Sequence, residues 1–135
     1  MEYQDYVRAV QQASQYLQTG HLNEAVDAFY KLILSDISDI DKASLCVKLA
    51  VVYDRMGKTE DALAWYDKGI TNEQAYYRFD VAERKAHYLS QLGRNTEAAA
   101  IYEDLIKQPF VSEGDRDRMR QVIKAFLSKT LRGWK

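Results

Sequence analysis

The sequence contains a single cysteine and a single proline among its 135 residues. One cysteine, Cys46, excludes a disulfide framework within the chain and leaves a zinc cluster without thiolate ligands. Proline breaks the interior of a helix, so its scarcity favours long helices.

Long apolar runs are also absent. The longest such stretches, for example residues 49–53, are far shorter than the roughly 20 residues that span a bilayer. The first twenty residues have no apolar run and carry Glu2 and Asp5, so they do not resemble a secretory signal. We therefore expect a cytoplasmic protein without a membrane span. The formal net charge of −1 argues against a dedicated binder of polyanions.

Three segments of the chain, residues 15–33, 52–70 and 88–106, align on a glycine. The glycines stand 37 and 36 residues apart, at Gly20, Gly57 and Gly93. Alanine recurs five residues after and seven residues before each glycine, an aromatic residue recurs nine after, and isoleucine recurs thirteen after. The residues in these columns are Ala25, Ala62 and Ala98; Ala13, Ala50 and Ala86; Phe29, Tyr66 and Tyr102; and Ile33, Ile70 and Ile106.

Apolar residues recur at three- and four-residue steps on both sides of each glycine, which predicts two helices joined by a turn. The glycine ends the first helix, because a left-handed backbone is inexpensive only without a Cβ atom. The residues predicted to cap the second helix of each pair are Asn23, Thr59 and Asn95. Each pair is a hairpin that must stack on a neighbour to bury its apolar face.

This pattern, over about residues 4–108, resembles the tetratricopeptide repeat (TPR) family. The resemblance implies an all-α fold of three TPR helix–turn–helix repeats, stacked as a right-handed α-solenoid with a C-terminal capping helix. The expected repeats cover about residues 4–37, 41–73 and 76–109 of one domain that spans residues 1–135. Gly69 stands in a column that usually holds alanine in the family.

The spacing predicts six helices within the repeats. Their expected ranges are residues 3–18, 23–36, 41–56, 59–70, 73–92 and 96–107. Asp39 or Asp41 is expected to cap the third of these helices.

A different segment follows Pro109. Ser112 is a predicted N-cap with Asp115 three residues later, and a helix is expected at about residues 113–132. The apolar residues that recur there at helical spacing are Met119, Val122, Ile123, Phe126, Leu127 and Leu131. The favoured interpretation is a helix that caps the last hairpin. The alternative is a helix that docks on another protein or forms a homodimer.

The sequence predicts no catalytic residue, metal site or cofactor. Cys46 lies in an apolar column, which favours a small buried side chain over a reactive thiol. His21 and His87 belong to no metal-binding motif, and the acidic residues 36–41 lack the glycine and glutamate of a calcium loop. No nucleophile signature is present, so we expect a protein that is not an enzyme.

In the TPR family the first helix of each repeat lines a concave groove, so the resemblance implies a peptide-binding groove here. The implied groove residues are Val7, Val10, Gln11, Ser14, Leu17, Ser44, Val47, Lys48, Val51, Asp54, Arg55, Asp80, Glu83, Arg84, His87 and Gln91. Their mixture of apolar and charged side chains favours an extended or helical peptide that carries both kinds of residue.

Some TPR cochaperones hold the C-terminal carboxylate of heat-shock chaperones with a clamp of lysine and asparagine. The corresponding positions here are Val10, Ser14, Lys48, Asp80 and Arg84. Only Arg84 keeps the expected basic character at its place, and Asp80 reverses a charge. We therefore expect no binding of a chaperone tail through a carboxylate clamp.

The expected function is a non-catalytic protein–protein interaction module or adaptor. The alternatives are a nucleic-acid-binding helical repeat, a homo-oligomeric structural subunit, and a chaperone for client proteins. Residues 108–135 carry a net charge of +4, whereas residues 1–107 carry −5. The basic side chains of this end are Arg116, Arg118, Arg120, Lys124, Lys129, Arg132 and Lys135. A solvated helix face is their favoured interpretation, so nucleic acid is not the expected partner.

The sequence has ten tyrosines, and the densest aromatic group is residues 76–79. The favoured interpretation of this group is packing at a turn between repeats. The alternative is an aromatic anchor for a bound segment, because tyrosine and arginine are enriched at interface hot spots.

Overall fold

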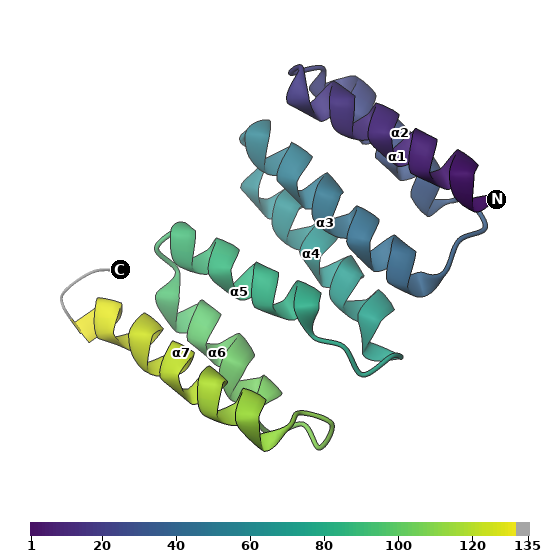
Figure 1. The fold of residues 1–135 in the computed structure, drawn as a ribbon. Helices are drawn as coiled ribbons and strands as arrows, with labels where there is room; N and C mark the ends of the chain where they lie inside the picture. The colour runs from purple at the N-terminus through teal and green to yellow at the C-terminus, as the bar shows by residue number, and fades with distance from the viewer. Residues whose placement is uncertain (132–135) are drawn as a thin grey trace. The chain divides into compact units, whose positions relative to one another are not determined.

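A computed structural model describes residues 1–131 of the chain, which form seven α-helices and no strand (Figure 1). The helices are α1 (Tyr3–Gln18), α2 (Leu22–Ile33), α3 (Asp39–Arg55), α4 (Thr59–Gln74), α5 (Asp80–Gln91), α6 (Asn95–Leu105) and α7 (Glu113–Leu131). The all-α prediction is confirmed, and α1 has the bounds predicted from the spacing. The side chain of Leu131 lies outside the described part of the chain. So do residues 132–135, which include the expected end of the last helix and the predicted basic residues Arg132 and Lys135.

Contacts divide the chain into two compact units, Met1–Val81 and Ala82–Lys135. Each unit is described below by itself. The single-domain organisation and the repeat bounds remain predictions.

The core of the first unit is built from the repeat columns. Ala13, Ala25 and Phe29 are fully buried, and they pack in one cluster with Leu45 and Leu49 of α3. Alanine leaves the space that lets two helices approach closely, and the larger side chains fill the gaps beside it. The columns therefore mark the buried faces of the hairpins, as the spacing predicts.

The three turn glycines end helices in the way that the sequence predicts. Their φ angles are +80°, +76° and +80° at Gly20, Gly57 and Gly93, a region that residues with a side chain rarely adopt. Behind each glycine, a backbone N–H reaches back five residues to a carbonyl oxygen, as His21 does to Tyr16 at 2.8 Å. These turns are Schellman motifs, which satisfy the last carbonyl groups of a helix.

The predicted caps of the second helices are wrong. The residues directly before α2, α4 and α6 are His21, Lys58 and Arg94, and none of them makes a side-chain cap hydrogen bond. Asn23, Thr59 and Asn95 lie inside the first turn of these helices. The cause is the Schellman turn, which leaves one residue between the glycine and the next helix and so fixes the cap position.

The cap of α3 is also a correction, whereas that of α7 is confirmed. Ser38, and neither Asp39 nor Asp41, precedes α3, and its hydroxyl accepts a hydrogen bond from the backbone N–H of Asp41 at 3.1 Å. At α7 the Ser112 hydroxyl accepts from the Asp115 N–H at 3.1 Å and donates to the Asp115 carboxylate at 3.2 Å. Ser112 is thus the N-cap that the sequence predicts, and the Asp115 carboxylate binds its hydroxyl.

The junction between α4 and α5 differs most from the sequence prediction. Helix α4 continues to Gln74 rather than residue 70, and α5 begins at Asp80 rather than residue 73. Tyr77 takes the left-handed conformation (φ 57°) that glycine takes in the other turns, and Arg78 N–H reaches back to the Glu73 carbonyl. The Glu73 side chain is 2% exposed, and both carboxylate oxygens accept from the N–H of Val81 at 3.0 and 3.1 Å. A carboxylate from the end of α4 therefore stabilises the positive N-terminal end of α5.

In the second unit α7 packs against α6. Met119 and Phe126 of α7 are buried, and the Phe126 ring lies 5.9 Å from the ring of Tyr102 on α6. The Arg116 guanidinium donates to the backbone carbonyls of Ile106 and Gln108 at 3.0 and 2.9 Å, just beyond the end of α6. The apolar face of α7 thus covers α6, and an arginine from its first turn binds carbonyl groups of the segment that follows α6.

Candidate interaction surfaces

The groove residues predicted on α1 differ in how accessible they are. Val10 and Leu17 are half-buried and pack against the core cluster of the first unit. Val7 and Ser14 are half-buried outside that cluster, and Gln11 is exposed. Of the apolar groove residues predicted on this helix, Val7 is therefore the one that lies outside the core cluster.

The groove residues predicted on α3 of the first unit include both apolar and charged side chains. Val51 is 36% exposed, and Val47 and Lys48 are half-buried. The Arg55 guanidinium donates to the backbone carbonyl of Leu17 at 3.1 Å, so it binds the C-terminal end of α1. This contact brings α1 and α3 together. The remaining predicted residues of α3, Ser44 and Asp54, are exposed.

Two of the residues predicted on α5 are engaged inside the second unit. The Glu83 carboxylate accepts hydrogen bonds from the Tyr102 hydroxyl at 2.8 Å and from the Arg118 guanidinium at 2.7 and 3.2 Å. The His87 ring packs edge-on against Phe126, with 5.7 Å between the ring centroids. The Glu83 carboxylate therefore connects α5 directly to Arg118 of α7 and, separately, to Tyr102 of α6. Glu83 is half-buried, whereas His87 is exposed despite its ring contact, as are the other predicted residues of α5, Asp80, Arg84 and Gln91.

Two groups of this network, Tyr102 and Arg118, keep their protonation states near neutral pH. Burial and the hydrogen bond to Glu83 raise the pKa of the Tyr102 phenol well above its usual value. The same carboxylate raises the pKa of Arg118, since it stabilises the charged guanidinium. Tyr102 therefore stays protonated and Arg118 stays charged over the physiological pH range, which is the behaviour of a structural ion pair.

Cys46 is buried, which confirms the sequence prediction. Burial raises the pKa of its thiol, and the Asn72 side-chain amide lies 3.8 Å from the sulfur. A thiol whose pKa is raised carries little thiolate at neutral pH, so it is a poor nucleophile.

Most of the basic side chains of α7 have partners within the second unit. Arg120 pairs with Asp117 at 2.8 Å, and the Lys129 ammonium donates to the Ser90 hydroxyl at 3.3 Å. Arg116 and Arg118 are bound as described above. Within the described residues, Lys124 makes no side-chain hydrogen bond or ion pair. The positive charge of this helix is thus used largely inside the protein.

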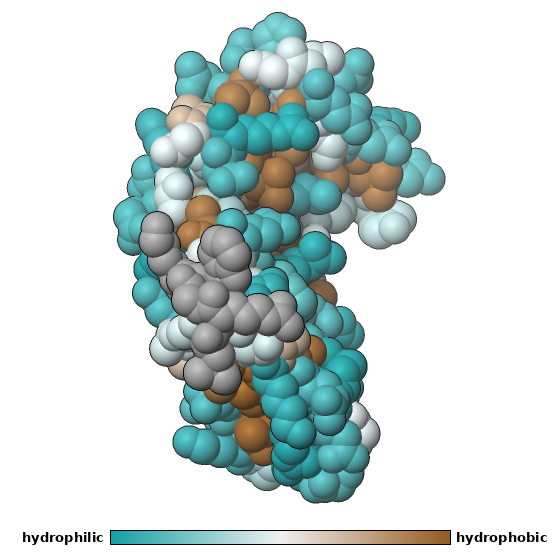
Figure 2. Space-filling model, turned by 90° about the vertical axis from the view of Figure 1, so that its left-hand side faces the viewer, coloured by the Kyte–Doolittle hydropathy of each residue, from teal (hydrophilic) through white to brown (hydrophobic). Residues whose placement is uncertain are grey.

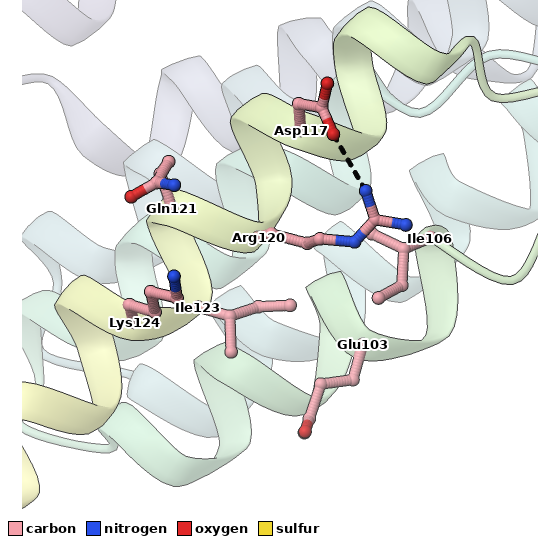
Figure 3. A pocket seen from close by; sticks show the side chains of 7 residues that line it. All are labelled: Glu103, Ile106, Asp117, Arg120, Gln121, Ile123 and Lys124. Carbon is pink, nitrogen blue, oxygen red and sulfur yellow. Dashed lines mark hydrogen bonds and ion pairs between the residues drawn. The ribbon is translucent and has the colours of Figure 1, made fainter.

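The sequence did not predict the pocket that lies between α6 and α7, with a volume of about 460 Å³ (Figure 3). The lining side chains are Glu103 and Ile106 of α6, and Asp117, Arg120, Gln121, Ile123 and Lys124 of α7. In Figure 3, Arg120 extends across the pocket toward Ile106 while it pairs with Asp117. The three- and four-residue spacing of the α7 side chains is the signal that could have found this face.

The aromatic group at the start of α5 reaches the surface. Tyr76 and Tyr77 are exposed, Tyr77 by 70% of its surface.

On the face drawn in Figure 2, hydrophobic residues reach the surface in small groups with hydrophilic residues between them. A partner on that face would therefore contact apolar and polar side chains together.

The residues that the structure describes contain no group of three His, Cys, Asp or Glu side chains that could hold a metal ion. None of the described helices combines the length and the apolar character needed to cross a membrane.

A protein-family model, the domain of unknown function DUF6340, matches residues 11–94. The matched range is more than half of the chain. The chain belongs to the DUF6340 family. No curated protein matches this DUF6340 chain.

Among solved structures, the DUF6340 chain is similar to the "First TPR of Spaghetti (RPAP3) bound to HSP90 peptide SRMEEVD". The two chains are 18% identical with a TM-score of 0.61, and the likeness covers 94% of this chain and 99% of the other. At this level of identity the likeness shows the fold. The helical hairpins of this DUF6340 chain therefore have a TPR-like fold, as the repeat pattern predicts.

Proposed function

We propose that this chain is a non-catalytic protein-interaction module, an adaptor that binds a peptide or a helical segment of another protein. The observation that carries the proposal is the TPR-like fold, because the similar TPR domain was solved with a peptide bound. That likeness extends over nearly the whole of both chains. Membership of the TPR family and a cytoplasmic location are part of the same proposal.

The proposed contact surface of the first unit is centred on Val7 of α1 and on Val47 and Val51 of α3. These valines lie outside the packed core cluster, so a partner can cover them without unfolding the unit. Lys48 and Asp54 stand beside them on α3 and supply one charge of each sign. Such a surface suits a partner with apolar anchors between charged residues, since the anchors give affinity and the charges set orientation.

On α5 the proposal relies on Arg84 and Gln91, which are exposed. Within the described residues, Arg84 makes no side-chain hydrogen bond or ion pair. Glu83 and His87 already contact α6 and α7, so releasing Glu83 would leave Arg118 without its closest carboxylate. We therefore assign Glu83 and His87 a supporting position and Arg84 a direct contact.

The test is an affinity capture of partners from a lysate, read by mass spectrometry, with a variant that changes the proposed contacts. Val47→Gln, Val51→Gln and Arg84→Glu together should remove the partners that the unchanged chain captures. A matched control makes three exposed changes on second helices of the hairpins: Ala64→Gln, Ala100→Gln and Lys31→Glu. If the contact variant folds and still captures the same partners, this surface assignment is wrong.

A further inference from the structure

The pocket between α6 and α7 has an apolar centre and charged edges. Ile106 of α6 and Ile123 of α7 are half-buried and line it from the two helices. Asp117, Arg120 and Lys124 recur along α7 at three- and four-residue steps, so they occupy one face of that helix. The pocket, called the α6/α7 groove below, thus has side chains of both signs along its rims (Figure 3).

The order of packing in the two units shows what this groove lacks. In the first unit α3 packs against α2, and α4 then packs against α3. In the second unit α7 packs against α6 in the same order, but no helix follows α7 within the described residues. Among residues 1–131, therefore, none covers α7 in the way that α4 covers α3.

The charges on the rims indicate which occupant fits. Asp117 and Arg120 neutralise each other at 2.8 Å. Glu103 on the α6 rim and Lys124 on the α7 rim are both exposed, and neither side chain has a hydrogen bond or ion pair within the described residues. A groove with an unpaired acid on one rim and an unpaired base on the other is complementary to a copy of itself turned about a two-fold axis.

We propose that two copies of this chain associate through the α6/α7 groove as a two-fold dimer. Ile106 and Ile123 of both copies form the apolar centre, and Glu103 of each copy pairs with the partner's Lys124. Helix α7 has 19 residues and is about 28 Å long, which suffices for an antiparallel helix pair. A stable interface covers about 800 Å² on each partner, more than one short groove provides, so the dimer is weak and depends on concentration.

The experiment is sedimentation velocity on the full chain from about 10 µM to about 1 mM, with charge-reversal variants. Glu103→Lys or Lys124→Glu alone should raise the dimer dissociation constant about tenfold, because each turns two attractive pairs into repulsive ones. The double variant restores both pairs with exchanged signs, so its dissociation constant should return to within about threefold of the unchanged chain. Ile123→Ser removes the apolar centre and should abolish the dimer over this range, with circular dichroism as the check on folding.

Glu24→Lys and Lys31→Glu on α2 make the same charge changes at exposed positions of the first unit and should leave the dissociation constant unchanged. A chain that stays monomeric up to about 1 mM overturns the proposal, whether or not it captures other proteins. A dimer that the two single reversals leave intact, or that the double reversal does not restore, overturns it as well.

Discussion

Gly69 of α4 packs tightly against α3 and the start of α5, and replacing it with alanine tests how much space is left there. A Cβ atom at position 69 would lie 3.0 Å from Val81 Cγ1, 3.2 Å from Cys46 Cβ and 3.3 Å from the Ala43 carbonyl oxygen. Ordinary contacts between carbon atoms are about 3.5–4.0 Å. Two of the three neighbours belong to the backbone or the Cβ of α3, so they cannot turn aside as the end of a flexible side chain can.

Two opposing effects decide whether Gly69→Ala raises or lowers the free energy of unfolding. Alanine is favoured over glycine in a helix by about 1 kcal/mol. Forcing an extra methyl group into a packed core costs about 1–3 kcal/mol, and here the methyl meets three neighbours at once. We expect overpacking to prevail and to lower the free energy of unfolding by about 1 kcal/mol, measured by urea titration with circular dichroism.

A double-mutant cycle separates this cause from a general loss of stability. Val81→Ala removes the nearest of the three atoms, so Gly69→Ala should cost about 0.5–1 kcal/mol less in that background. Gly57→Ala is the matched control, since a Cβ there meets nothing within 4 Å and only the φ of +76° opposes it. Its cost, about 1 kcal/mol, should add to that of Val81→Ala. A Gly69→Ala chain that is more stable, or a cost that Val81→Ala leaves unchanged, would refute the reasoning.

Three further results are expected. Glu73→Ala should lower the free energy of unfolding by about 1–3 kcal/mol and speed amide hydrogen exchange at Val81, because that buried N–H loses its acceptor; unchanged exchange would contradict this. The raised pKa of Tyr102 means that its contribution to stability is complete below about pH 10 and is lost as the pH rises beyond that, through the higher folded-state pKa. Stability measured by urea titration between about pH 8 and pH 11 should therefore decline less in Tyr102→Phe than in the unchanged chain. An equal decline in the two chains would count against a raised pKa of Tyr102. The peptide SRMEEVD should bind no better than a scrambled control in calorimetry, since Asp80 reverses a charge of the carboxylate clamp, and low-micromolar, sequence-dependent binding would show that prediction wrong.

The helices and their turns could be predicted because they depend on neighbours in the sequence. Glycine at Gly20, Gly57 and Gly93 permits the left-handed turn, and apolar residues at helical spacing mark the buried faces. The same local reasoning fails at Tyr77, which adopts the left-handed conformation although it is not a glycine. The acceptor that caps α5 is Glu73, eight residues before the N–H that it binds, so only the folded turn brings them together.

The candidate site was less predictable because its side chains contact residues that are distant in the sequence. The spacing places Glu83 one step from the core column of α5, which is compatible both with an open groove and with a contact to another helix. Its partners Tyr102 and Arg118 are 19 and 35 residues away. The column of Tyr102 predicts a packed ring, but the hydroxyl at the end of that ring needs an acceptor once the ring is fully buried. A tyrosine in that column, where Phe29 stands in the first hairpin, is therefore the sequence signal that a nearby polar side chain on α5 is bound internally.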